Sequence, residues 1–183
     1  MFQKLCTLVL KLHGWKVIDK VGMNNLKKCV MVAAPHTSNW DYYFTMLMLF
    51  SLGIKFKFLA KSSLFKFPLS WIMRNTGGIP VDRSKSTSLI PRMVALIESS
   101  ENLTLLIAVE GTRSYTKQWK PGFYHIAKGA NIPIACGFLD YESKTGGFLA
   151  TFMPKENFET DLPEIQAIYK GIKGKNANQF AVE

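Results

Sequence analysis

Cysteine and histidine are scarce in this sequence, with three of each among 183 residues. The cysteines, Cys6, Cys29 and Cys136, are odd in number and widely spaced. This argues against a disulfide framework and a zinc site, and it favours a reducing compartment. A glycine-rich phosphate loop of the nucleotide-binding kind is also lacking. We therefore expect neither a metal nor a bound cofactor.

Long apolar runs are missing as well. The N-terminal stretch MFQKLCTLVLKLHGW and the internal stretch YYFTMLMLFSLGI are both shorter than the ~20 apolar residues that cross a bilayer. The first stretch also has no signal-peptide cleavage site. We therefore expect no membrane-spanning segment.

Acidic residues are few, because 13 Asp and Glu stand against 23 Lys and Arg, which gives a formal charge of +10. Such an excess favours anionic partners, for example phosphorylated metabolites, anionic lipid headgroups or nucleic acid. Charge alone does not choose among these partners.

The apolar residues, which make up 48% of the chain, are arranged for one compact domain with an additional N-terminal helix. Residues 2–12 place a broad apolar arc opposite Lys4 and Lys11, and Gly14 is suited to end this helix. Two interpretations remain open, a helix packed on the core and an amphipathic helix lying in a membrane surface. We divide the chain into this helix, residues 1–14, and a single domain, residues 15–183.

The rest of the chain alternates between predicted strands and helices. Strands are expected at residues 29–36, 55–60, 77–83, 103–109, 132–138 and 148–154, and helices at 39–52, 88–99, from about 122, and from Asp161 and Pro163 onward, fading into the polar tail KGKNANQ. The central strands are apolar throughout. This pattern predicts an α/β fold with a largely parallel central sheet flanked by helices, and reactive groups beyond the carboxyl ends of the strands.

One candidate catalytic pair is His36 and Asp41 in the stretch HTSNWD. Five residues on one helix would separate them by ~140°, so they cannot be neighbours on a helix face. If Ser38 is the N-cap, however, a loop histidine can fold back over the first turn and donate its ring N–H to Asp41. The pair could then activate a hydroxyl group. The alternative is that Asp41 only caps the helix.

Two further stretches are candidates for binding an anion. Glu110, Gly111, Thr112 and Arg113 follow an apolar strand, and they combine a tight turn with a hydroxyl and a guanidinium suited to phosphate. Arg83 ends the stretch GGIPVDR and could face a second phosphate oxygen. Taken alone, each stretch could also be an ordinary surface turn.

The segment KSSLFKFPLSWIMR, residues 61–74, mixes aromatic and basic side chains. Such a mixture suits a membrane interface or the entrance for an acyl chain. It also suits core packing or stacking on single-stranded nucleic acid.

Together the stretches HTSNWD, GGIPVDR, EGTRS and IPIACG resemble, in order and approximate separation, the four sequence blocks of the glycerolipid acyltransferases. The resemblance is greatest to the 1-acylglycerol-3-phosphate (lysophosphatidic acid) acyltransferases, and it covers about residues 30–138. It implies acyl transfer from acyl-coenzyme A or acyl carrier protein, as co-substrate, to the free hydroxyl of a lysophospholipid.

The same resemblance assigns roles to individual residues. His36 would be the general base and Asp41 the residue that orients it. Arg83 and the block Glu110 to Arg113 would hold the acceptor phosphate, and residues 132–137 would belong to the acyl-donor side. Family members often carry Asn before the histidine and Phe-Pro before the third block, where this chain has Pro35 and Ala108-Val109, so the acceptor stays open.

We therefore expect a cytoplasmic enzyme, peripheral on the inner face of a membrane. Its partners would be an acyl thioester donor, a lysolipid acceptor and an anionic membrane surface, with acyl carrier protein as one possible carrier. The alternatives are the same chemistry on another acceptor, such as a lyso-ornithine lipid, and a non-catalytic binder of anionic lipid or nucleic acid. Nucleic acid is disfavoured because it explains none of the four blocks.

Overall fold

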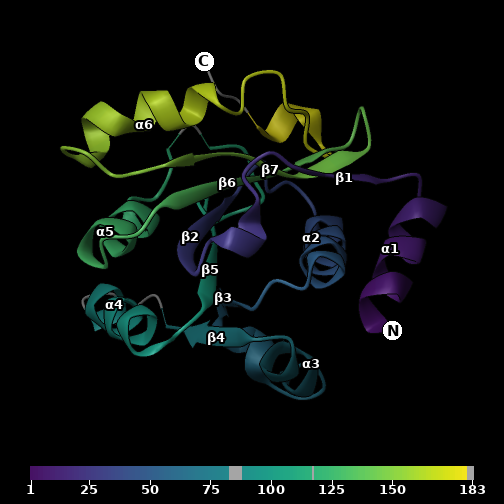
Figure 1. Cartoon of the computed structure of the whole chain (residues 1–183), viewed down its shortest axis with the longest axis horizontal. Coiled ribbons are helices and arrows are strands. Elements are labelled where there is room, and N and C mark those ends of the chain that lie inside the picture. The colour runs from purple at the N-terminus through teal and green to yellow at the C-terminus, as the bar shows by residue number, and fades with distance from the viewer. Residues whose placement is uncertain (83–87, 117, 181–183) are drawn as a thin grey trace.

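The computed structural model describes residues 1–82, 88–116 and 118–180. Within them a seven-stranded sheet has the order β1-β7-β6-β2-β5-β3-β4 (Figure 1). The strands are β1 (Lys16–Asp19), β2 (Lys28–Ala33), β3 (Phe56–Lys61), β4 (Gly78–Val81), β5 (Leu103–Ala108), β6 (Ile134–Asp140) and β7 (Thr145–Phe152). The pairing of β6 with β7 is antiparallel and the other pairings are parallel. The predicted α/β fold with a largely parallel sheet is confirmed.

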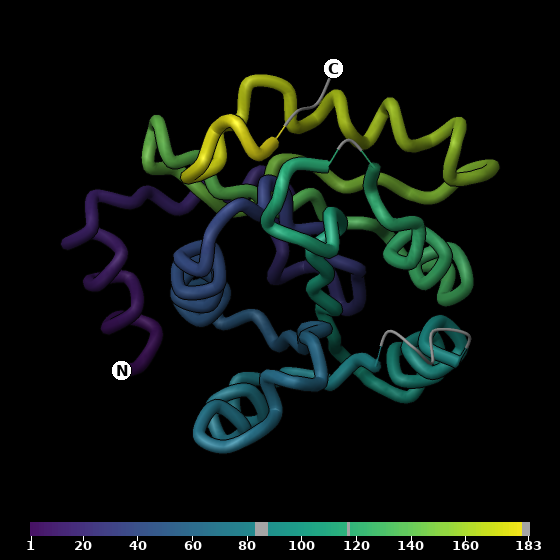
Figure 2. Tube along the Cα trace, turned by 180° about the vertical axis from the view of Figure 1, so that it is seen from behind, coloured from purple at the N-terminus to yellow at the C-terminus, as the bar shows by residue number. Residues whose placement is uncertain are grey.

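Helices cover both faces of this sheet (Figures 1 and 2). They are α1 (Phe2–Leu12), α2 (Asn39–Leu52), α3 (Ser70–Asn75), α4 (Leu89–Ser99), α5 (Gly122–Gly129) and α6 (Phe158–Ala167). Strand β2 illustrates the layering, because Val30 and Val32 join a core cluster with α4, α5 and α6, while Cys29 and Met31 join another with α2 and α3. Alternate residues of this central strand face opposite sides of the sheet, so all of them must be apolar to fill the core on each side.

Helix α2 begins where the sequence predicts. The Ser38 hydroxyl accepts a hydrogen bond from the Trp40 N–H, and the Asp41 carboxylate accepts one from the Ser38 N–H, so both halves of a capping box are present. The helix ends at Gly53, whose φ of 70° is the left-handed conformation that glycine adopts at little cost. This start places His36 in the loop directly before α2.

Helix α1 lies on the outer side of α2 and buries only Cys6 and Leu10 of its apolar side chains (Figure 1). Leu5, Leu8 and Leu12 stay exposed. One stripe of apolar residues on α1 therefore packs on the core, and another faces outward. This is compatible with a helix packed on the core and with an amphipathic helix lying in a membrane surface. The division of the chain after residue 14 stays a prediction.

The predicted start of the last helix was wrong. Helix α6 begins at Phe158, because the Asn157 side chain caps it by accepting a hydrogen bond from the Thr160 N–H, so Asp161 and Pro163 lie inside the helix. The polar tail follows this helix, and residues 174–179 pack on the loop that contains His36. Strand β1, a four-residue edge strand, was not predicted at all.

Candidate active site

The two main candidate loops lie side by side because of the strand register. Strands β2 and β5 are parallel neighbours, and their last residues, Ala33 and Ala108, are direct partners. The loops that follow therefore leave the same edge of the sheet. A hydrogen bond from the His36 N–H to Glu110 Oε1, 3.0 Å long, joins them.

His36 and Asp41 form the pair that the sequence predicts. His36 Nδ1 lies 3.3 Å from Asp41 Oδ2, and the two side chains are 21% and 5% exposed. The same Asp41 oxygen accepts the Thr37 and Ser38 N–H groups at 2.7 and 2.8 Å. Capping and pairing are therefore simultaneous roles of one carboxylate. This pairing assigns the ring proton to Nδ1 and leaves Nε2 to accept a proton from a hydroxyl group.

Tyr141 completes the surroundings of Asp41, and sequence reasoning missed it. Its hydroxyl donates a 2.7 Å hydrogen bond to Asp41 Oδ1. A signal was present in the sequence, because Tyr141 directly follows the apolar strand β6. That strand is parallel to β2, so its carboxyl end lies beside the His36 loop.

The Glu110 side chain is buried, at 2% exposure, and it contacts the backbone of the His36 loop. Its Oε1 accepts the His36 N–H, and its Oε2 has no hydrogen-bond partner among the residues that the structure describes. Burial raises the pKa of Glu110 to about 7; the hydrogen bond from His36 opposes this, and the charge of Asp41 adds to it. A role for Glu110 in binding substrate stays a prediction.

The remaining predicted binding residues are distributed unevenly. Gly111 has a φ of 64°, which turns the chain sharply after β5, and Thr112 and Arg113 are exposed. Arg83 lies outside the described residues. The end of β4, Val81, is two strands away from β5, which corresponds to roughly 10 Å across the sheet.

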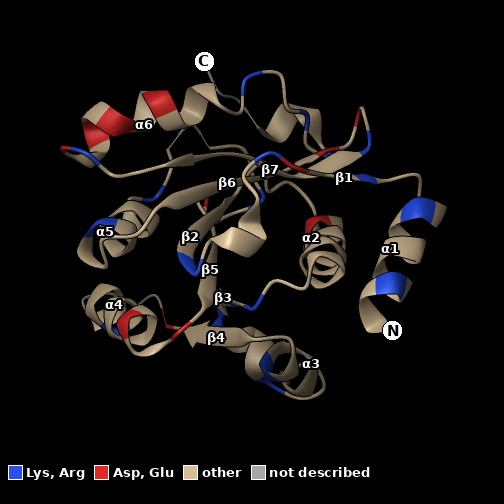
Figure 3. Cartoon of the chain, in the orientation of Figure 1, with Lys and Arg blue, Asp and Glu red and all other residues tan. Residues whose placement is uncertain are grey.

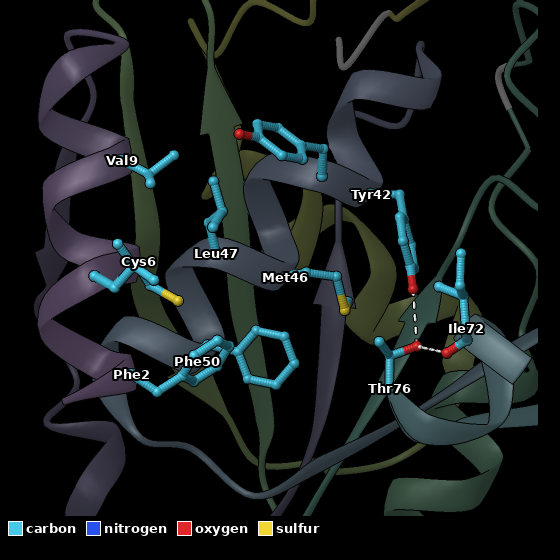
Figure 4. A pocket seen from close by; sticks show the side chains of 11 residues that line it. Phe2, Cys6, Val9, Tyr42, Met46, Leu47, Phe50, Ile72 and Thr76 are labelled. Atoms are coloured by element: carbon cyan, nitrogen blue, oxygen red, sulfur yellow. Dashed lines mark hydrogen bonds between the residues drawn. The ribbon is translucent and has the colours of Figure 1, made fainter.

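An apolar groove of about 290 Å³ opens between α1, α2 and α3. Figure 4 shows its lining, with Phe2, Cys6 and Val9 of α1 facing side chains of α2. The groove also includes Tyr42, which follows Asp41 directly and bonds to Thr76 at 2.9 Å. The groove is therefore lined by the residue that follows Asp41 in helix α2.

These observations agree with the comparison to known proteins. A family model described as Acyltransferase matches residues 13–136, more than half of the chain. The chain belongs to the Acyltransferase family. This confirms the predicted membership of the glycerolipid acyltransferase superfamily. Because the match ends at residue 136, Tyr141 and residues 174–179 lie beyond it.

Two curated plant proteins are similar to this acyltransferase-family chain. The 1-acyl-sn-glycerol-3-phosphate acyltransferase BAT2 of Brassica napus, described as chloroplastic, is 28% identical over 134 residues, covering 68% of this chain and 38% of the relative. The 1-acyl-sn-glycerol-3-phosphate acyltransferase LPAT1 of Arabidopsis thaliana, also described as chloroplastic, is 25% identical over 130 residues, covering 68% of this chain and 36% of the relative. The chain thus spans less than two fifths of the length of these relatives.

A solved structure shares the fold. The crystal structure of the 1-acyl-sn-glycerophosphate (LPA) acyltransferase PlsC from Thermotoga maritima matches with a TM-score of 0.62 and 15% sequence identity. The match covers 93% of this chain and 75% of that one. The two chains therefore share the same overall fold.

The fourth block of the family pattern lies inside the molecule. Ile134, Ala135 and Cys136 have no exposed surface, and a side chain on Gly137 would collide with Met31. The structure therefore gives this block a packing role in β6. A contribution to binding the acyl donor stays a prediction.

The C-terminal segment, residues 174–179, ties the two candidate loops together. Asn176 donates from its side chain to the Thr37 carbonyl at 2.7 Å and from its backbone N–H to the Thr37 hydroxyl at 3.2 Å. Gln179, with its amide nitrogen turned toward two carbonyl groups, donates to the backbone oxygens of Thr37 at 3.0 Å and Arg113 at 2.8 Å. These bonds fix the spacing between the His36 loop and the Arg113 loop.

Large apolar side chains are exposed beside the groove. In the segment before and within α3, Phe67 is 96% exposed and Trp71 is 73% exposed, and Leu69 and Ile72 are also exposed. The charged residues are distributed unevenly. Those of α1 are all lysines and the one in α3 is Arg74, whereas those of α6 are acidic (Figure 3). None of the helices formed by the described residues has the length and apolar composition needed to cross a bilayer.

Proposed function

We propose that the chain transfers a fatty acyl group from an acyl thioester to the free hydroxyl of a lysophospholipid, such as 1-acylglycerol-3-phosphate. The carrier of the thioester would be coenzyme A or acyl carrier protein. The observation that carries the proposal is the contact of His36 Nδ1 with the buried Asp41 carboxylate, at the loop edge of a sheet with the family fold. The similar plant proteins bear names with this activity, which supports the acceptor.

In the proposed reaction, His36 Nε2 removes the proton from the acceptor hydroxyl as its oxygen attacks the thioester carbonyl. The C–S bond then breaks, an ester forms, and His36 returns the proton to the departing thiolate. Asp41 holds the ring and stabilises the imidazolium that forms between these two steps. Because a thioester is already an activated acyl donor, this chemistry needs no covalent enzyme intermediate.

The acceptor phosphate would be held by Arg113, with Arg83 as a second candidate. The support is chemical and local, since a guanidinium binds phosphate in a bidentate manner and Arg113 is exposed three residues after Glu110, whose side chain bonds the His36 N–H. The formal charge of +10 would attract such anionic substrates.

The groove between α1, α2 and α3 suits an acyl chain. Its lining is almost wholly apolar, and Tyr42, one residue after Asp41, contributes to it. An acyl chain in the groove would bring its carbonyl end toward His36 while the methylene groups leave water.

We also propose that the exposed apolar side chains of α1 and of residues 67–72 enter an anionic membrane surface. Lys4, Lys11 and Arg74 accompany these side chains, which is the combination that interfacial segments use. A lysophospholipid could then move from the bilayer to His36 without crossing water.

The direct test is to incubate the purified protein with an acyl thioester and a panel of lysolipids, and to follow both thiol release and acylated lipid. The proposal predicts thiol release that depends on a lysophospholipid and matches lipid product in amount. Thiol release with no acylated lipid, or tight nucleic-acid binding with no thioester consumed, would contradict it and favour a different function.

The acceptor class is tested by replacing Arg113 with Ala. A phosphate-bearing acceptor should then show a raised KM, because one charged contact is lost. If instead a lyso-ornithine lipid is the best substrate and the Arg113→Ala protein uses it unchanged, the same chemistry acts on an acceptor without phosphate.

A further inference from the structure

We propose that Tyr141 is a positioning residue, which holds the Asp41 carboxylate in the orientation that His36 requires. Its hydroxyl lies 2.7 Å from Asp41 Oδ1, on the carboxylate oxygen that faces away from His36. Tyr141 follows β6 and lies beyond the residues that match the family model, so the family pattern does not assign it.

The two oxygens of Asp41 have unequal surroundings. Oδ2 accepts two hydrogen bonds, from the N–H groups of Thr37 and Ser38, and it lies 3.3 Å from His36 Nδ1. Oδ1 receives one donor within the described residues, the hydroxyl of Tyr141. The capping bonds hold Oδ2, and within the described part of the chain the Tyr141 hydrogen bond is the one that holds Oδ1 and so opposes rotation of the carboxylate. Such rotation would lengthen or misalign the 3.3 Å contact with His36.

Tyr141 is itself held firmly enough to perform this task. Its ring meets the rings of Trp15 and Phe44 edge to face, at centroid distances of 5.0 and 6.1 Å. Its backbone N–H donates to the Lys173 carbonyl at 2.9 Å. The ring position therefore comes from packing, and the hydroxyl adds the bond to Asp41.

The Tyr141 phenol is also protonated, as a hydrogen-bond donor to Asp41 must be. Burial, the hydrogen bond to Asp41 and the negative charge of Asp41 raise the pKa of Tyr141 well above its usual range. The hydroxyl consequently keeps its proton at any working pH and acts as the donor, and the carboxylate is the acceptor.

The test compares Tyr141→Phe with Tyr124→Phe. The first keeps the ring and its packing and removes only the hydroxyl at a half-buried position, so the variant is expected to fold. The second is a matched control, because Tyr124 also donates to a buried aspartate, Asp161 Oδ2 at 2.8 Å, but joins α5 to α6. Both variants lose one hydrogen bond of the same kind.

Two readouts separate positioning from packing. In acyl transfer, a readout that rests on the proposed function, Tyr141→Phe should lower kcat about tenfold with KM nearly unchanged, and Tyr124→Phe should lower neither. The nitrogen NMR signals of the His36 ring do not depend on the reaction. In the Tyr141→Phe protein, the Nε2-protonated tautomer of His36 should gain population, and the Tyr124→Phe protein should match the wild type.

The outcomes are distinct. If the tautomer changes in Tyr141→Phe alone but no substrate is turned over, the positioning role stands and the proposed function fails. If the His36 signals of Tyr141→Phe match the wild type, or if both variants alter them equally, the proposal is overturned. An Asp41→Asn background adds a check on kcat, since Tyr141→Phe should cause no further loss there; additive losses would also overturn it.

Discussion

At the scale of single residues, two carboxylates lie close to His36 and their surroundings give them different properties. Asp41 accepts hydrogen bonds from backbone N–H groups and the Tyr141 hydroxyl, and it contacts the His36 ring, so its charge is compensated. Glu110 is buried and accepts one bond, from the His36 N–H. Burial raises the pKa of Glu110 to about 7, so near neutral pH it is partly protonated. Ionisation of Glu110 therefore lowers the free energy of unfolding of the protein, and this loss can be measured.

Replacing Glu110 with Gln should remove this cost. Below pH ~4.5 the carboxyl is protonated in both the folded and the unfolded chain, so ionisation costs nothing. As the pH rises from there toward 7, only the unfolded chain ionises, so the wild-type protein loses stability until the loss levels off above pH ~7. The free energy of unfolding of Glu110→Gln relative to wild type should therefore rise by about 3 kcal/mol over this window. Chemical denaturation at several pH values measures it.

The control for this experiment is within the same data. At pH 4, any difference between the free energies of unfolding of the two proteins should reflect only how the amide of Gln packs in place of the carboxyl group. Stability curves that run parallel from pH 4 to 8 would mean that Glu110 titrates normally in the folded protein.

The sequence predicted the contact between His36 and Asp41, because capping preferences and a five-residue spacing restrict how the two side chains can meet. It did not predict that Glu110 would bond the His36 N–H, because the register of β2 and β5 is a tertiary property. Tyr141 was missed for a related reason. Its role depends on β6 lying next to β2, and chain order alone does not fix strand order.

At the scale of elements, the groove depends on how α1 and α2 pack. Periodicity predicted both helices, and residues 39–52 form α2 as expected. The pattern could not predict that the apolar arc of α1 is divided between core, groove and outer surface. An arc wider than one helix contact leaves side chains for other partners, and only the packing angle decides which ones.

A bulky side chain in the groove should change the preferred acyl length. Val9 lines the groove and its neighbour Leu8 is exposed outside it, so Val9→Trp fills the groove and Leu8→Trp does not. We expect Val9→Trp to prefer shorter acyl thioesters than the wild type, and Leu8→Trp to keep the wild-type preference. Competition assays with mixed-length thioesters in detergent would measure this. An unchanged preference in Val9→Trp would remove the groove as the acyl site.

At the scale of the whole molecule, charge and exposed apolar surface together suggest how it would meet a membrane. In Figure 3, helix α6, which contains acidic residues, lies at the top of the view, and helix α3, where Trp71 and Ile72 are exposed, lies at the bottom. The net charge follows directly from the sequence. The fold was needed to show that the acidic residues of α6 lie apart from the basic residues of α1 and α3. An anionic bilayer would attract the face with α1 and α3 and repel α6.

Removing two of the exposed aromatic side chains should weaken membrane binding. We expect the double variant Phe67→Ala and Trp71→Ala to bind anionic vesicles at least about tenfold more weakly, because each side chain would lose favourable transfer from water. Met153→Ala removes an exposed apolar side chain at the end of β7 and should bind as the wild type does. Vesicle flotation measures both. Equal binding by all three proteins would locate the membrane contact elsewhere.

The central claim is that His36 is the general base of acyl transfer. The most direct measurement is the initial rate of thiol release from an acyl thioester in the presence of lysophospholipid, for His36→Ala and for His125→Ala, which alters an exposed histidine on α5. With both variants folded, we predict that His36→Ala loses about 10²- to 10⁴-fold in kcat and that His125→Ala stays at the wild-type rate. A His36→Ala protein that retains the wild-type rate would contradict the claim.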